Sequence, residues 1–217
     1  MDIPFVAAPE GTMDIPFVQA RYYKAIPDDQ PREIQDIVMH TIECPEKPKT
    51  AIGVANMFHV GPVDQHGNPR PASAHLCIDA QQVVQCVRYQ DVAYGAPGTN
   101  RNGIHIEHAG YAAQTPEQWK DDFSVSELCL SAQVVAGLCK EYEIPVAFVD
   151  AEGLLAGVHG ITTHAEVSKA CLLANQRGLT SSDFYNTANP HKPMTDHSDP
   201  GKYFPMDAYL EGVASFT

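Results

Sequence analysis

The segment Gly103-Ile104-His105-Ile106-Glu107-His108 predicts a buried β-strand in this chain of 217 residues. Its isoleucines alternate with polar residues, and in a strand this period of two places Ile104 and Ile106 on one face and His105 and Glu107 on the other. The apolar face is typical of a sheet packed against helices. A glutamate that points off the other face requires a reason, which makes Glu107 a candidate functional residue.

Further strands are expected before this segment. Ile34 to His40 is an apolar run of strand length, and His40 falls at its C-terminal end, where sheets tend to present functional side chains. Ser73 to Ile78 and Gln82 to Val87 are separated by Asp79-Ala80-Gln81, whose length and turn residues predict a hairpin. The sheet is therefore expected to contain at least one antiparallel pair.

Helices are expected between and after these strands. From Ser126 to Tyr142, apolar residues recur at i, i+4, i+7 and i+11, the stripe of an amphipathic helix on a sheet, with Ser124 or Ser126 as its cap. Shorter helices are predicted over residues 51–59, 150–156, 165–177 and 206–213. Residues 157–164 lead through glycines to His164 at the edge of a loop, and residues 61–71 and 181–199 are expected to be irregular. The pattern predicts an α/β fold, a single domain with a mixed central β-sheet flanked by helices.

Composition and charge exclude several classes of protein. Apolar residues make up 44% of the chain, as in ordinary globular domains, and no apolar run approaches the length of a membrane span. The net charge of -13 would repel a phosphate backbone, so nucleic acid is excluded as a partner. The six cysteines form no CxxC pair and are expected to be reduced and mostly buried.

The N-terminal residues contain a duplication, because the sequence MDIPFV occupies residues 1–6 and again residues 13–18. We interpret residues 1–12 as a duplicated start or a tag, with a native extension as the alternative, and residues 13–217 as the catalytic domain. The first residues lack the basic region and apolar stretch of a secretory signal. Synthesis in the cytoplasm without a signal peptide is therefore expected.

Five segments, in this order and spacing, resemble the type 2 N-acetylmuramoyl-L-alanine amidase family, which includes peptidoglycan recognition proteins and phage amidases. The resemblance covers about residues 32 to 205. Its segments are Ile37-Val38-Met39-His40-Thr41, Ser73-Ala74-His75-Leu76-Cys77-Ile78-Asp79, Ala93-Tyr94-Gly95-Ala96 with Asn102-Gly103-Ile104-His105-Ile106-Glu107, Gly160-Ile161-Thr162-Thr163-His164, and Asp199-Pro200-Gly201.

The resemblance implies a zinc site and a catalytic carboxylate. It makes His40, His164 and Asp199 the zinc ligands and Glu107 the catalytic residue. Two imidazole nitrogens and one carboxylate oxygen form a three-ligand set that leaves catalytic zinc a fourth position for water. Alone, each residue has a common structural explanation: a core histidine, an ion-paired glutamate, or an aspartate in a turn.

One departure from the family concerns the residue two positions before the third ligand. The family usually has lysine there, whereas this chain has His197. A protonated His197 would stabilise the oxyanion of the reaction, and activity would then fall as the pH rises through its titration. Lys192 is the alternative cation.

Other polar residues in the segments are candidate substrate contacts. We predict that His75 lies beside the substrate, with a structural role in its strand as the alternative. Asn102 is predicted to contact the muropeptide, although loop asparagines usually serve turns. His105 shares a face with Glu107 and is expected to orient that carboxylate.

The resemblance implies hydrolysis of the amide between the lactyl group of N-acetylmuramic acid and L-alanine in peptidoglycan, as in the catalytic module of a phage endolysin. Such an enzyme acts on the bacterial cell wall after the membrane is breached. Because the acidic surface offers no general attraction to an anionic wall, a separate cell-wall-binding domain outside this sequence is expected. The alternatives are a cytoplasmic recycling amidase that acts on soluble muropeptides and a non-catalytic peptidoglycan-binding module.

Overall fold

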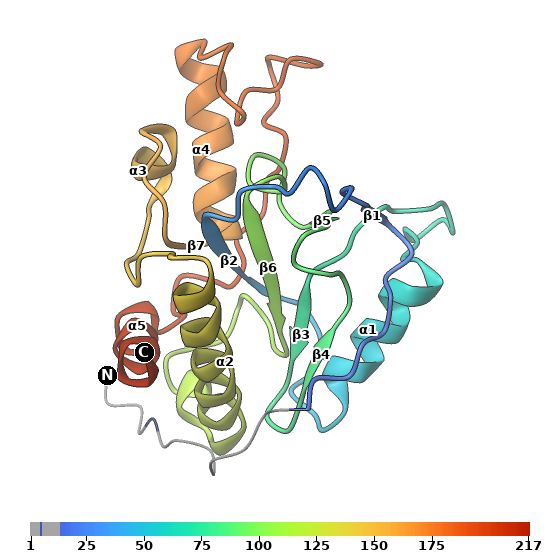
Figure 1. Cartoon of the computed structure of the whole chain (residues 1–217), viewed down its shortest axis with the longest axis vertical. Helices are drawn as coiled ribbons and strands as arrows, with labels where there is room; N and C mark the ends of the chain where they lie inside the picture. The colour runs from blue at the N-terminus through green and yellow to red at the C-terminus, as the bar shows by residue number, and fades with distance from the viewer. Residues whose placement is uncertain (1–4, 6–13) are drawn as a thin grey trace.

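A computed structural model of the chain describes Phe5 and residues 14–217. The duplicated start expected at residues 1–12 lies outside the described residues except for Phe5. A five-stranded sheet lies in the middle of the molecule (Figure 1), with the strand order β4-β3-β6-β2-β7. Its strands are β2 (Asp36–Thr41), β3 (Leu76–Ile78), β4 (Val83–Gln85), β6 (Gly103–His108) and β7 (Ile161–Thr163).

The sheet is mixed, as predicted. Strands β3, β6, β2 and β7 run parallel, whereas β3 and β4 form the expected antiparallel hairpin. A separate two-stranded sheet pairs β1 (Tyr23–Lys24) with β5 (Val92–Ala93). The α-helices are α1 (Thr50–Val60), α2 (Asp122–Glu141), α3 (Ala151–Leu155), α4 (His164–Arg177) and α5 (Met206–Phe216), and a 3-10 helix covers Gln118–Lys120.

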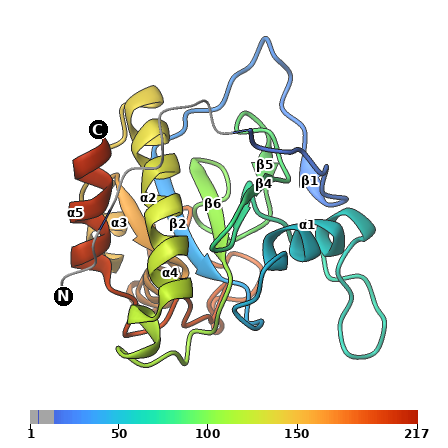
Figure 2. The same cartoon turned by 90° about the horizontal axis from the view of Figure 1, so that it is seen from below.

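One face of the sheet packs against α2 and α5. Ile104 and Ile106 of β6 are fully buried there beside Leu128 of α2 and Tyr209 of α5. Figure 2 shows α5 next to α2, on the side of the strands away from α1. Burying each large aliphatic side chain contributes about 1.5–3 kcal/mol to stability, so this layer is the main core of the domain.

The opposite face is covered only in part. Helix α1 packs Phe58 near Cys77 of β3, and α3 and α4 pack around Val38 of β2. The alternation of β6 turns His105 and Glu107 toward this second face. The polar side chains of the central strands therefore lie between α1 and α4.

Two differences from the sequence prediction concern His164 and the start of α2. Residues 161–163 form β7, which pairs with β2, and His164 is the first residue of α4 rather than a loop residue. The Thr163 side chain caps that helix by accepting a hydrogen bond from the Glu166 N–H. Helix α2 begins at Asp122 and is capped by Asp121. The predicted cap Ser124 lies inside the helix, where its hydroxyl donates a hydrogen bond to Glu46.

Contrary to the expectation that no apolar run has the length of a membrane span, α2 is long and apolar enough to cross a membrane, and it is the only such helix in the described part of the chain. Half of that stretch is buried inside the domain, where its apolar face contacts the sheet and α5. A core helix has this same composition, so α2 is explained by its packing.

Candidate metal centre

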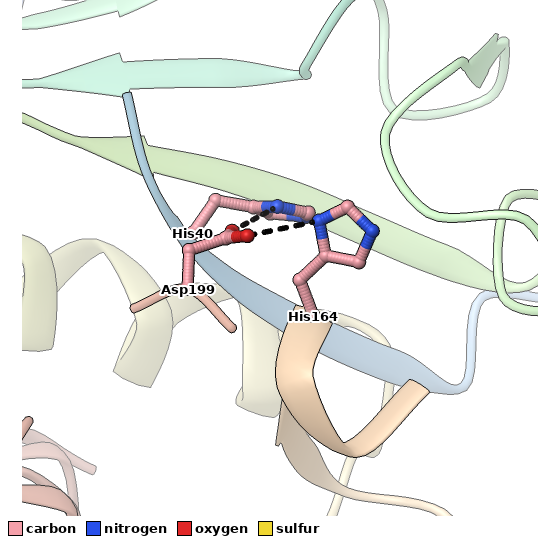
Figure 3. Close-up of side chains that lie close together, drawn as sticks. All are labelled: His40, His164 and Asp199. Atoms are coloured by element: carbon pink, nitrogen blue, oxygen red, sulfur yellow. Dashed lines mark hydrogen bonds and ion pairs between the residues drawn. The ribbon is translucent and has the colours of Figure 1, made fainter. Parts of the chain in front are cut away.

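Three acid–base side chains from distant parts of the chain meet at the carboxyl end of β2. His40 lies near the end of β2, His164 follows directly after β7, and Asp199 lies on the segment that returns from α4. The Asp199 carboxylate faces both rings (Figure 3), with Oδ2 3.0 Å from His40 Nδ1 and Oδ1 3.4 Å from His164 Nδ1. The pairing of β2 with β7 sets the two histidines side by side, and Asp199 completes the group.

The dimensions of this group fit a metal ion. One donor atom from each residue lies within 4.8 Å of the others, and the residues are only 2% (His40), 4% (His164) and 6% (Asp199) exposed. A tetrahedral ion with bonds of about 2.0–2.1 Å holds neighbouring ligand atoms about 3.3 Å apart. The two nitrogen–oxygen distances, 3.0 Å to Oδ2 and 3.4 Å to Oδ1, are each close to that spacing. Two nitrogens and one oxygen are also the donor set that zinc accepts.

The charges of the group favour a cation. Burial alone would raise the pKa of Asp199, but hydrogen bonds with His164, His197 and His40 outweigh it and hold the pKa well below its usual range. The carboxylate is therefore ionised at neutral pH. Burial lowers the pKa of His164 to about 4, so the His164 ring is neutral and able to donate a lone pair.

Glu107 stands next to His40 on the neighbouring strand. The two residues are register partners between β2 and β6, so their side chains leave the same face of the sheet. Its Oε2 atom is buried and has no hydrogen-bond partner among the described residues. Burial, with a smaller contribution from the charge of Asp199, raises the pKa of Glu107 to about 7, although His40 opposes the shift. A carboxyl group with such a pKa can both accept and release a proton near neutral pH.

His197 lies at the open side of the group. Its ring stacks on His164 with the ring centres 4.3 Å apart, and its Nδ1 is 3.3 Å from Asp199 Oδ1. Its side chain is 46% exposed, so it borders the solvent. His197, Lys192 and Glu107 all line a cleft of about 640 Å³ between α1 and the 192–199 segment. The structure thus brings His197 and Glu107 to the His40 group.

The two predicted substrate contacts lie elsewhere. His75 is fully buried, and its Nδ1 accepts a hydrogen bond from the His105 N–H, contacts that fit the structural alternative, and its place beside the substrate stays a prediction. The Asn102 amide donates to Asp36 at the start of β2, the opposite end of that strand from His40. Asn102 does not line the His40 cleft, and its contact with the muropeptide stays a prediction.

The sequence did not indicate two contacts of the histidines. His105 Nδ1 lies 3.1 Å from His40 Nε2, and its expected role in orienting Glu107 stays a prediction. Thr195 places its hydroxyl 2.7 Å from His164 Nε2. Only the position of Thr195, four residues before Asp199, could have suggested it.

A larger cavity of about 1220 Å³ lies at the other end of β2. Asp36, Asn102 and His159 line it. Among the described residues, the His40 cleft is the one that contains a group able to hold a metal ion, so chemistry rather than volume identifies the candidate site.

The α/β fold and the buried His-His-Asp group define a candidate metalloenzyme. The chain belongs to the N-acetylmuramoyl-L-alanine amidase family of type 2, whose model matches residues 30–202. No curated protein matches the chain significantly.

Solved structures share the fold. Staphylococcus aureus hydrolase AmiA, solved with its ligand, has a TM-score of 0.60 at 15% identity over 97% of this chain and 85% of that chain. N-acetylmuramoyl-L-alanine amidase LysC from Clostridium intestinale URNW has a TM-score of 0.55 at 13% identity over 94% and 99%. AmpD has a TM-score of 0.54 at 18% identity over 92% and 94%. These similarities confirm the predicted amidase-like fold class.

Proposed function

We propose that this chain hydrolyses the amide bond between the lactyl group of N-acetylmuramic acid and L-alanine in peptidoglycan, with zinc held by His40, His164 and Asp199. The observation that carries the proposal is the buried group of two imidazoles and one ionised carboxylate, with Glu107 on the neighbouring strand. Membership of the amidase family supports the choice of bond.

The residues of the cleft have separate tasks in this proposal. Zinc, when bound, supplies Lewis acidity and lowers the pKa of a water molecule from 15.7 to about 7. Glu107 accepts a proton from the attacking water and passes it to the departing L-alanine nitrogen. His197, at the rim of the group, donates a hydrogen bond to the oxyanion that develops on the lactyl carbonyl.

We further propose that the domain spans residues 13–217 and is the catalytic module of a phage endolysin. It would be made in the cytoplasm and would act on the cell wall after the membrane is breached, aided by a separate wall-binding domain. Residues 1–12 would be a duplicated start or a tag. A recycling amidase is the alternative, and the two differ in substrate: an endolysin cleaves intact sacculi, whereas a recycling enzyme acts on soluble muropeptides.

The deciding experiment is mass spectrometry of digested peptidoglycan. The wild-type protein is expected to release stem peptides with a free L-alanine amine, and a chelator is expected to abolish the products. Glu107→Gln should bind zinc but release no product, whereas the matched variant Glu211→Gln, at an exposed position of α5, should match the wild type. Products cut at another bond, or full activity of Glu107→Gln, would overturn the assignment.

The same variants test a non-catalytic binding module. Such a module would sediment with sacculi and yield no products at any zinc concentration.

A further inference from the structure

His105 of β6 contacts His40, the first of the proposed metal ligands. The Nδ1 atom of His40 faces Asp199, while its Nε2 atom lies 3.1 Å from His105 Nδ1. The two ring centres are 5.3 Å apart, and His105 is completely buried. The contact therefore lies out of reach of solvent, on the side of His40 opposite Asp199.

The ring of His105 is held firmly in this place. The His105 N–H donates to His75 Nδ1 at 2.9 Å, the His75 N–H donates to the His105 carbonyl at 2.9 Å, and the two rings stack at 5.8 Å. A Cβ atom at Gly95 would lie 2.5 Å from the His105 ring, so glycine at position 95 makes the room that the ring occupies.

The positions of the ring protons on His40 and His105 explain what this contact does. An imidazole that gives the lone pair of Nδ1 to a cation must carry its proton on Nε2. In His40 that proton then needs an acceptor, and the bare Nδ1 of a neutral His105 is within hydrogen-bond distance. His105 must in turn carry its own proton on Nε2.

One atom of the pair is left unsatisfied. His105 Nε2 is buried and has no hydrogen-bond partner among the described residues. An unpaired buried polar atom destabilises a fold, so an apolar side chain here would suit packing alone better than histidine. His164 has a comparable arrangement, because its Nε2 faces the Thr195 hydroxyl while its Nδ1 faces Asp199.

We propose that His105 is a positioning residue that keeps the proton of His40 on Nε2 and so presents Nδ1 to the metal ion. The inference rests on the proposed zinc site and goes beyond it, because it assigns the ligand atom of His40 and the residue that selects it. Removal of such a partner typically costs 10–100-fold in metal affinity.

Two variants of similar size separate this role from packing. His105→Asn keeps an acceptor near the position of Nδ1, whereas His105→Leu removes it. Zinc affinity is measured by competition with a chromophoric chelator, and the unfolding temperature of the metal-free proteins is recorded alongside. The Leu variant should bind zinc about 10–100-fold more weakly than the wild type, and the Asn variant should retain most of the affinity.

Equal zinc affinity of the Leu variant and the wild type would overturn the inference, and so would equal losses in both variants. Should the Leu variant not fold, the nitrogen–proton couplings of the histidine rings in the zinc-loaded wild type provide the test: a proton on His105 Nδ1 would overturn it. A wild-type protein that binds no zinc would instead refute the proposed function, so the two failures are distinguishable.

Discussion

Gly201 provides the sharpest test of how Asp199, the third proposed metal ligand, is held in place. Its φ is +96°, in the backbone region that favours glycine, and a Cβ atom there would lie 2.0 Å from the Ala112 carbonyl oxygen. Replacement by alanine is therefore expected to strain the backbone two residues after Asp199.

The cost of Gly201→Ala has two sources. A non-glycine residue in a sparsely populated backbone region costs about 1–3 kcal/mol. The Cβ atom also meets backbone rather than a flexible side chain, and forced overpacking of this kind costs typically about 1–3 kcal/mol. In a domain of this size each kcal/mol lowers the unfolding temperature by about 2–4 °C, so a fall of at least about 4 °C is expected.

The same variant should lose activity, because a shift of about 1 Å in a positioned group can cost on the order of 100-fold in rate. Gly137→Ala is the matched control: Gly137 lies in α2, where a Cβ atom would meet nothing within 4 Å. Alanine there should raise stability by about 0.5–1 kcal/mol. Equal unfolding temperatures and equal activities of the two variants, measured by thermal unfolding and product release, would refute the reasoning.

Three further outcomes are expected. Burial raises the pKa of Glu127 well above its usual value, so above about pH 4.5 the folded state holds a proton that the unfolded state has released. Stability should therefore fall as the pH rises toward the folded pKa. Glu127→Gln should flatten this dependence of stability on pH, measured by urea unfolding between pH 5 and 8. Asp121→Ala removes the cap of α2, which accepts the Ser124 N–H at 2.8 Å, and should cost about 1 kcal/mol, seen as a fall of about 2–4 °C in unfolding temperature. Zinc at 100 times its dissociation constant should stabilise the wild type by about 2.7 kcal/mol, and Asp199→Ala should abolish that shift.

Much of the sheet could be predicted from local patterns. Strand β6 matches the alternating segment from Gly103 to His108 residue for residue, because its two faces differ so clearly in polarity. Strand β7 was missed because only three residues pair with β2 and a glycine precedes them, so no periodicity develops. Helix α4 starts at His164 because Thr163 caps it, and this start could have been predicted, since Thr163-His164-Ala165-Glu166 has the local pattern of a capping box.

Part of the candidate site could also be predicted, from the resemblance to the family. The family pattern indicated His40, His164, Asp199, Glu107 and His197, which the fold brings together, although their roles stay proposals. The contact of Asn102 could not be predicted, because only the folded structure shows that it lies beside the start of β2, where Asp36 accepts a hydrogen bond from its side-chain amide. His75 accepts a hydrogen bond from the His105 N–H, and a local sequence pattern cannot predict such a contact between segments 30 positions apart.

Asp199 lies on residues 179–199, a described segment that contains neither helix nor strand. It is separated from His40 by 159 positions, so an ion shared by the two would act as a cross-link that closes most of the chain into a ring. Detachment of that segment alone would open the ring while the sheet stayed intact. Metal exchange would then proceed through local opening, and a protease should cut residues 179–199 faster in the metal-free protein than in the loaded one.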